Sequence, residues 1–143
     1  MKALSVVGWI LMGMGLLGLL HVRALVSPSP VAIVVQVAAA LLMIWARFTF
    51  GLRSFHATAN PTEGVLITHG PYRFIRNPVY TSVVLFAFAG AAANLSALSA
   101  GWALATLVGA LVRIFLEERF LRATYPDYAE YAKRTPRMIP WLF

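Results

Sequence analysis

The sequence contains no cysteine and few charged residues. Without a thiol, the chain can form neither a disulfide framework nor a thiolate zinc site, and it has no cysteine nucleophile. The three histidines are scattered without the spacing of metal ligands, so we predict no metal site. Charged residues make up 12% of the chain and hydrophobic residues 60%, which lies outside the usual range of soluble domains. The composition is typical of an integral membrane protein.

Acidic residues are rarer still, with 5 Asp and Glu against 12 Lys and Arg and a formal net charge of +7. A basic chain can bind nucleic acid, but here the arginines stand at the ends of apolar runs rather than on one polar face. Basic residues that flank apolar runs are what the positive-inside rule describes for membrane proteins. We therefore expect a membrane, and no nucleic acid, among the partners of this chain.

Two long stretches carry no charge, between Arg23 and Arg47 and between Arg76 and Arg113. The first fits one membrane span of about 20 residues. The second is longer and is interrupted by Asn94-Leu95-Ser96, which predicts a tight helical hairpin. With the apolar run near the N-terminus, the pattern predicts an all-α integral membrane protein with about four transmembrane helices, at residues 4–26, 31–50, 79–93 and 98–116.

Polar and proline-rich segments separate the predicted helices. Residues 27–30 read Ser-Pro-Ser-Pro and predict a short turn, because proline removes a backbone donor and disfavours helix at the residue before it. Residues 51–78 contain several prolines and glycines and predict a loop with short helical pieces at the interface. The charged and aromatic residues 117–134 predict an amphipathic helix on the membrane surface. We interpret residues 1–143 as one membrane domain.

The basic residues also predict the orientation of the chain. Every Lys and Arg except Arg23 falls on one side of the predicted membrane helices. The positive-inside rule then puts both termini and the segments 51–78 and 117–143 in the cytoplasm, with the helices in the cytoplasmic (inner) membrane. An alternative for the first apolar run is a signal peptide, but the run exceeds the about 7–15 apolar residues of such peptides, which favours a retained helix.

The fourth predicted helix carries small residues at every fourth position, namely Gly101, Ala105 and Gly109. This spacing predicts close packing against another helix. The glycines of the first helix show no regular four-residue spacing.

Residues 68–80 form the most informative polar stretch, directly before an uncharged helix. Gly70 and Pro71 bend the chain, and Arg73 and Arg76 supply cationic donors. Pro78 fits a first helical turn, which leaves backbone amides free. These features suit a polar ligand. The alternative is an interfacial belt that only anchors the bilayer surface.

A second polar group, Arg113, Glu117 and Glu118, stands at the end of the fourth predicted helix. Arg113 and Glu117 lie one turn apart, so a local ion pair is one interpretation. A functional site is the other, because ionisable groups at the end of a span usually face the protein interior or a water-filled cavity.

Several motifs, in this order and in this membrane context, resemble the isoprenylcysteine carboxyl methyltransferase and phospholipid methyltransferase superfamily. They are Gly70-Pro71-Tyr72-Arg73-x-x-Arg76-Asn77-Pro78-x-Tyr80, Glu117-Glu118, Tyr128-x-x-Tyr131 and Arg137-x-x-Pro140. The likeness covers over half of the chain, whereas the first two helices match only in hydropathy. Two positions depart from it: Asn77 stands where many members have histidine, and Pro126 where a Phe-Gly turn is common. Asparagine can form hydrogen bonds but cannot act as a general base.

The resemblance implies S-adenosylmethionine as the cofactor, held by the loop before the third helix, the start of that helix and the acidic end of the fourth. The residues it assigns to the cofactor are Val65, Leu66, Ile67, Tyr72, Asn77, Pro78, Val79, Tyr80 and Glu117. It assigns Arg113 to binding the substrate carboxylate. Glu118 completes the acidic pair. If the acceptor is an amine or a thiol, Glu118 and Tyr80 are the candidate bases, so the catalytic candidates are Arg113, Glu118 and Tyr80.

The predicted function is transfer of a methyl group from S-adenosylmethionine to a lipophilic acceptor at the cytoplasmic face of the membrane. Two classes of acceptor are possible: an isoprenoid or prenylcysteine-like carboxylate, and a lipid amine. The sequence does not distinguish between these two classes. One alternative is an NADPH-dependent membrane reductase of the sterol-reductase type, although the sequence has no Gly-rich dinucleotide fingerprint. The other is a non-catalytic lipid-binding subunit.

Overall fold

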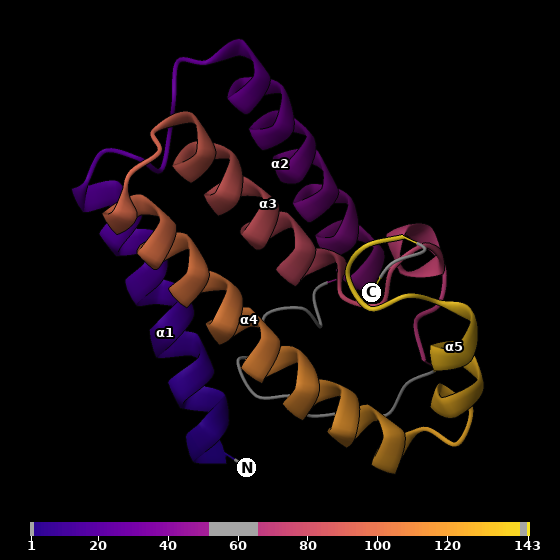
Figure 1. Cartoon of the computed structure of the whole chain (residues 1–143). Coiled ribbons are helices and arrows are strands. Elements are labelled where there is room, and N and C mark those ends of the chain that lie inside the picture. Colours follow the sequence, from indigo (N-terminus) through magenta and orange to yellow (C-terminus); the bar gives the residue numbers. More distant parts are fainter. Residues whose placement is uncertain (1, 52–65, 141–142) are drawn as a thin grey trace.

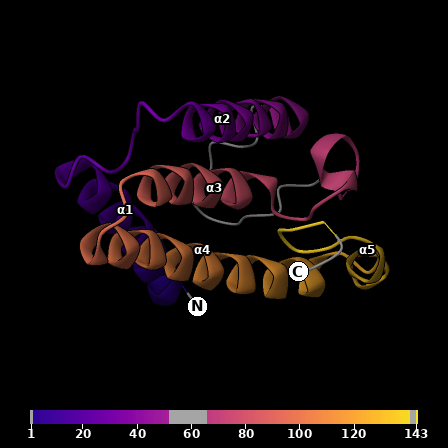
Figure 2. The same cartoon turned by 45° about the horizontal axis from the view of Figure 1, so that its top comes forward.

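The computed structural model describes residues 2–51, 66–140 and 143, and within these ranges it contains helices and no strand. The elements are α1 (Lys2–His21), α2 (Pro30–Phe50), the 3-10 helix η2 (Gly70–Arg73), α3 (Pro78–Ala93), α4 (Ala97–Thr124) and α5 (Tyr128–Arg134). The long helices pack in the order α1, α4, α3, α2 (Figure 1), and Figure 2 shows α3 lying between α4 and α2. The predicted all-α membrane class is confirmed.

Three of the described helices are long and apolar enough to cross a membrane, namely Ala3–His21, Pro30–Phe50 and Ala97–Thr124. The fourth, α3, is apolar but shorter. It forms the predicted hairpin with α4, whose start is fixed by a reciprocal cap. Ser96 Oγ accepts from the Ser99 amide at 3.0 Å, and Ser99 Oγ accepts from the Ser96 amide at 2.9 Å.

The first helix ends at His21 rather than at residue 26, so the predicted boundary was wrong. Arg23 adopts a φ of 55°, in the left-handed region. The amides of Arg23 and Ala24 donate back to the carbonyls of Leu20 and Leu19, at 3.0 and 2.8 Å. These are the two bonds of a Schellman motif, which satisfies the last carbonyls of a helix. The turn after it is tied to α2, because Gln36 Nε2 donates to the Leu25 carbonyl at 2.6 Å.

The predicted single amphipathic helix at residues 117–134 was also wrong. Helix α4 runs without a break to Thr124, and α5 begins only at Tyr128. No proline or glycine interrupts the chain between residues 116 and 124, whereas Pro126 disfavours helical geometry at Tyr125 before it. Glu117 and Glu118 therefore stand inside a long helix rather than at its end. Of the predicted loop 51–78, residues 52–65 lie outside the described part of the chain.

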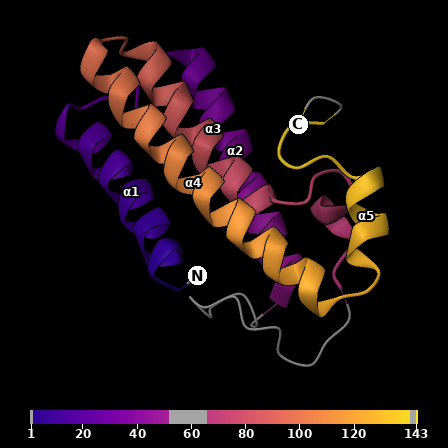
Figure 3. The same cartoon turned by 60° about the horizontal axis from the view of Figure 1, so that its bottom comes forward.

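Helices α1 and α4 approach so closely that glycines are required between them (Figure 3). A Cβ atom on Gly15 would lie 2.6 Å from the Thr106 amide nitrogen, and one on Gly109 would lie 2.7 Å from the Gly8 carbonyl oxygen. The predicted close packing is therefore found at Gly109, whereas a Cβ on Gly101 would meet nothing within 4 Å.

Candidate functional site

The polar motifs of the sequence meet at one end of the helical bundle. The start of α3, the later turns of α4, η2 and α5 all lie at the end where α1 begins (Figure 1). Two neighbouring clusters of buried polar side chains form there. One is centred on Arg113 and Glu117, and the other on Glu118.

In the first cluster, Arg113 joins helices α3 and α4. The Arg113 side chain is almost fully buried, with 3% of the residue exposed. Its Nε donates to the Tyr80 hydroxyl at 3.0 Å, and that hydroxyl donates to Glu117 Oε1 at 2.7 Å. Arg113 also forms an ion pair with Glu117. The predicted pair within one helix is thus part of a three-residue network that crosses to α3.

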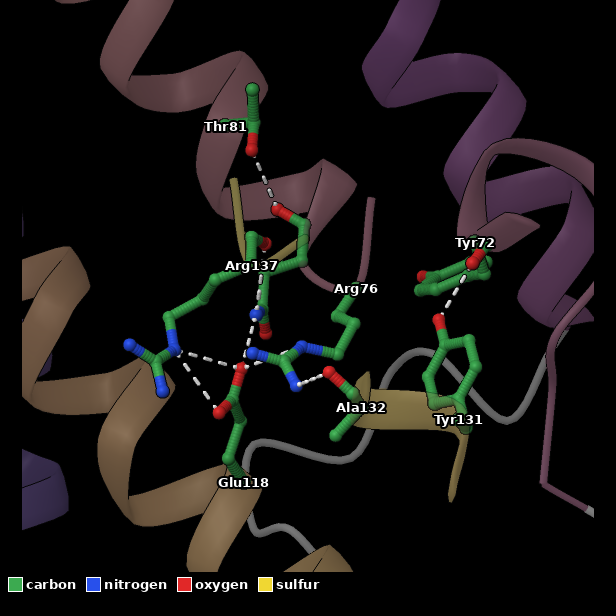
Figure 4. Close-up of polar contacts among 8 residues, drawn as sticks. Tyr72, Arg76, Thr81, Glu118, Tyr131, Ala132 and Arg137 are labelled. Atoms are coloured by element: carbon green, nitrogen blue, oxygen red, sulfur yellow. Dashed lines mark hydrogen bonds and ion pairs between the residues drawn. The ribbon is translucent and has the colours of Figure 1, made fainter. Parts of the chain in front are cut away.

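In the second cluster, Glu118 accepts hydrogen bonds from two side chains and forms an ion pair with a third (Figure 4). Asn77 Nδ2 donates to Oε1 at 3.0 Å, and Arg137 Nε lies 3.2 and 3.1 Å from the two carboxylate oxygens. Arg76 Nε lies 3.3 Å from Oε1 in an ion pair without hydrogen-bond geometry. Glu118 is 3% exposed. A carboxylate buried this deeply is stable when its charge is paired and its lone pairs are used, as they are here.

The C-terminal segment lies along the loop before α3 and closes this cluster. The amides of Arg76 and Asn77 donate to the carbonyls of Pro136 and Arg137, at 2.9 and 3.1 Å. Thr81 Oγ1 donates to the Met138 carbonyl at 3.1 Å. Residues 136–138 therefore act as the hydrogen-bonding partner of the loop. The terminal Arg137 motif was noted in the sequence, but no role was predicted for it.

Three tyrosines surround the loop from η2 and α5. Burial raises the pKa of Tyr72 to about 12 and that of Tyr128 to about 12, and it also raises the pKa of Tyr131. These phenols therefore stay protonated at neutral pH. Tyr131 donates to the Tyr72 carbonyl at 2.6 Å (Figure 4), whereas the buried Tyr128 hydroxyl has no partner within the described part of the chain.

The first turn of α3 presents unused backbone donors. Pro78 occupies the first helical position, and Asn77, the N-cap residue, forms no capping bond with its side chain. The side-chain amide of Asn77 donates instead to the Glu118 carboxylate and to the Arg137 carbonyl. Helical geometry leaves the amides of Val79 and Tyr80 without an acceptor inside the helix. Such a helix start is suited to binding an anionic group.

The remaining predicted cofactor residues contribute no polar side chain. Leu66 and Ile67 are half-buried in the segment that leads to η2, and Val65 lies outside the described residues. Within the ranges that the structure describes, no three His, Asp or Glu side chains gather as a metal site.

An apolar cavity of about 180 Å³, which is open to the outside over much of its boundary, lies between α1, α2 and α3. Its lining consists of Leu16, Ala39, Ala40, Met43, Ser82, Val83 and Phe86. Val83 also packs against the hydrophobic cluster that contains Tyr80. Val83 is therefore shared by the lining of the cavity and the cluster around Tyr80.

Comparison with known proteins gives two matches. A sequence model of the phospholipid methyltransferase family matches residues 30–128. The cobalt-zinc-cadmium resistance protein CzcN of Cupriavidus metallidurans is 40% identical over 81 residues, which are 56% of this chain and 38% of that protein. The match thus spans less than two fifths of the length of this relative. No solved structure matches the chain. The family match begins with α2, so α1 lies outside it.

Proposed function

The chain belongs to the phospholipid methyltransferase family, and on that premise we propose that it transfers a methyl group from S-adenosylmethionine to a lipophilic acceptor at the cytoplasmic membrane face. The observation that carries this proposal is the buried network of Arg113, Tyr80 and Glu117 among apolar helices. Ionisable groups within membrane helices are costly and are retained mainly where they serve function.

The unused amides at the start of α3 and the carboxylate of Glu117 fit the cofactor. Glu117 keeps 24% of its side chain exposed, so part of this side chain can be reached by a ligand. We assign the carboxylate of the cofactor to the amides of Val79 and Tyr80, and one of its donor groups to Glu117. When bound, S-adenosylmethionine would supply a methyl group on a sulfonium, and transfer of that methyl group to the acceptor would release S-adenosylhomocysteine. The full proposed binding set is Val65, Leu66, Ile67, Tyr72, Asn77, Pro78, Val79, Tyr80 and Glu117.

The acceptor is assigned to Arg113 and to the apolar cavity. A guanidinium with several donors orients an oxygen-bearing headgroup, while the cavity beside Val83 suits a hydrocarbon chain. Alignment and exclusion of water supply much of the rate of such a transfer. A carboxylate acceptor requires no proton removal, whereas an amine requires a base, for which Tyr80 and Glu118 are the candidates.

Of these two candidates, the contacts favour Tyr80. Glu118 is engaged by Arg76, Asn77 and Arg137, so taking up a proton would leave two partly buried arginines without a counter-charge. The Tyr80 hydroxyl accepts from Arg113 and donates to Glu117, so it can take a proton from the acceptor while its own proton passes to the Glu117 carboxylate. We therefore assign Glu118 a positioning role, in which it holds the C-terminal segment against the loop.

The central test is incubation of the purified protein with radiolabelled S-adenosylmethionine and a host lipid extract, followed by identification of the labelled product. Labelled lipid is expected with the wild-type chain. In parallel, S-adenosylhomocysteine should stabilise the detergent-purified protein against heating while NADPH does not, because a ligand that binds only the folded state raises its apparent stability. Stabilisation by NADPH alone would point to the reductase and against this proposal.

The proposed orientation has its own test, which the absence of native cysteine simplifies. Ala129 in α5 and Val26 in the turn after α1 are both exposed. Single cysteines introduced at these positions should label from opposite sides of the membrane, with Ala129→Cys reached from the cytoplasm. Labelling of Ala129→Cys only from outside would refute the proposed route to a cytoplasmic cofactor.

A further inference from the structure

Helix α1 lies outside the family match, yet it contacts the buried arginine of the proposed site. We propose that Ser5 and Trp9 are positioning residues that fix Arg113 in the orientation in which it meets the methyl acceptor. This inference rests on the proposed function. It extends the acceptor end of the site to a helix for which the family likeness gives no role.

Each nitrogen of the Arg113 guanidinium is held by a different helix. Nε donates to Tyr80 on α3, one terminal nitrogen pairs with Glu117 on α4, and the other donates to the Ser5 hydroxyl on α1. Three contacts in different directions fix both the position and the rotation of a planar group. Without the Ser5 hydroxyl, one terminal nitrogen loses its hydrogen-bond acceptor, and the plane of the guanidinium is fixed by two contacts instead of three.

Trp9 holds the face of the same guanidinium. The Arg113 Cζ atom lies 4.9 Å from the centre of the Trp9 ring, within the range of a cation–π interaction. Trp9 is 41% exposed and Arg113 only 3%. The ring therefore covers a charge that would otherwise be costly to keep near lipid.

The backbone of α1 is shaped to receive the arginine stem. A Cβ atom on Gly8 would lie 2.9 Å from Arg113 Cγ and 3.1 Å from the Gly109 carbonyl oxygen. Ser5, Gly8 and Trp9 fall on one face of the helix, because residues three and four apart are neighbours there. One turn of α1 thus contacts the stem, the edge and the face of Arg113.

Trp9 could act by positioning Arg113 or simply by packing α1 on α4. A second tryptophan in the same interface allows these two roles to be separated. Trp102 packs against the α1 backbone at Gly18, where an added Cβ would meet its ring. It precedes Arg113 by eleven residues of helix, about 16 Å. Trp102→Leu is therefore a matched control that removes an indole from the same interface without touching the guanidinium.

The experiment compares Trp9→Leu, Trp9→Phe, Ser5→Ala and Trp102→Leu with the wild type. Methyl transfer from saturating labelled S-adenosylmethionine is measured against increasing host lipid extract, and S-adenosylhomocysteine affinity is measured calorimetrically. Trp9→Leu should raise the half-saturating lipid concentration about five- to thirtyfold, the range between an exposed and a desolvated cation–π contact. Cofactor affinity should stay within about twofold of the wild type, since the contacts assigned to the cofactor are untouched.

The other variants complete the test. Trp9→Phe keeps an aromatic face and should recover most of the loss, and Ser5→Ala should give a smaller rise than Trp9→Leu. Trp102→Leu should lower the melting temperature without changing half-saturation. A normal half-saturation in Trp9→Leu, or an equal rise in Trp102→Leu, overturns this inference and leaves the proposed function intact. If Trp9→Leu does not fold, Ser5→Ala decides by the same measurement, and an unchanged half-saturation in it overturns this inference. A wild-type chain that labels no lipid defeats the proposed function and this inference together.

Discussion

Glu117 and Glu118 are neighbours in α4 with the same chemistry, yet they serve different parts of the molecule. Successive residues of a helix point about 100° apart, so the two carboxylates face different neighbours. Glu117 meets Tyr80 and Arg113 inside the bundle and stays partly exposed, whereas Glu118 is buried among groups from the loop and the C-terminal segment. One turn of α4 thus presents the partly exposed Glu117 on one face, while on another face Glu118 holds the loop and the C-terminal segment.

The largest expected effect comes from Glu118. Glu118→Ala leaves Arg76 and Arg137 without their counter-charge, and breaking a buried ion pair typically costs about 3–5 kcal/mol. The variant should unfold at a much lower temperature, or fail to accumulate, as measured by thermal unfolding in detergent. Glu117→Gln also removes the counter-charge of the buried Arg113, but it keeps an acceptor for Tyr80 at a partly exposed site, so it should lower the melting temperature less than Glu118→Ala does. Equal destabilisation by the two substitutions would end the distinction drawn between the neighbours.

The next effect concerns cofactor affinity. Glu117→Gln removes a charged acceptor, and charge-assisted hydrogen bonds typically contribute about 1.5–3 kcal/mol. Affinity for S-adenosylhomocysteine, measured calorimetrically, should therefore fall roughly ten- to a hundredfold in a protein that remains folded. Unchanged affinity would remove Glu117 from the proposed cofactor set.

A contrasting result is expected for Arg113, one turn before Glu117. Arg113→Ala should leave S-adenosylhomocysteine affinity nearly intact while raising the half-saturating lipid concentration or lowering turnover. The same calorimetric and transfer assays measure both quantities. If the folded variant loses cofactor binding as severely as Glu117→Gln, the proposed division between cofactor and acceptor is incorrect.

The smallest effect concerns pH. Burial raises the pKa of Tyr72 to about 12 from an ordinary value near 10, so the unfolded chain releases this proton at lower pH than the folded chain does. Its contribution to stability is complete below pH 10 and is lost as the pH rises toward 12. Tyr72→Phe should therefore melt like the wild type between pH 7 and 9 and lose less stability above pH 10. A difference at neutral pH would indicate that the hydroxyl has a role beyond burial.

The sequence predicted those elements whose boundaries are marked by local chemistry. Pro30 and Pro78 stand at the first positions of α2 and α3, and both helices begin within one residue of the prediction. The end of α1 was missed because Arg23, rather than a glycine, takes the left-handed conformation. The end of α4 was missed because charge was interpreted as the end of a membrane helix, although charged residues do not interrupt helical geometry.

The packing of α1 was missed for a different reason. Gly8, Gly15 and Gly18 do not recur every four residues, so no stripe was predicted. Spacings of seven and three residues nevertheless keep side chains on one helical face, and all three positions lie against α4. The contact of Arg137 with Glu118 was beyond sequence reasoning, because nothing local indicates that the C-terminal segment returns to α4.

The backbone bonds from Arg76 and Asn77 to residues 136 and 137 have a consequence for biogenesis. The ribosome makes residues 136–138 after all the membrane helices, so those helices enter the bilayer before the loop ahead of α3 has its hydrogen-bonding partner. Until then Glu118 has no Arg137, and the start of α3 is joined to α4 through the side chains of Asn77 and Tyr80. We therefore expect the newly inserted chain to complete the cluster around Glu118 only when this short segment docks.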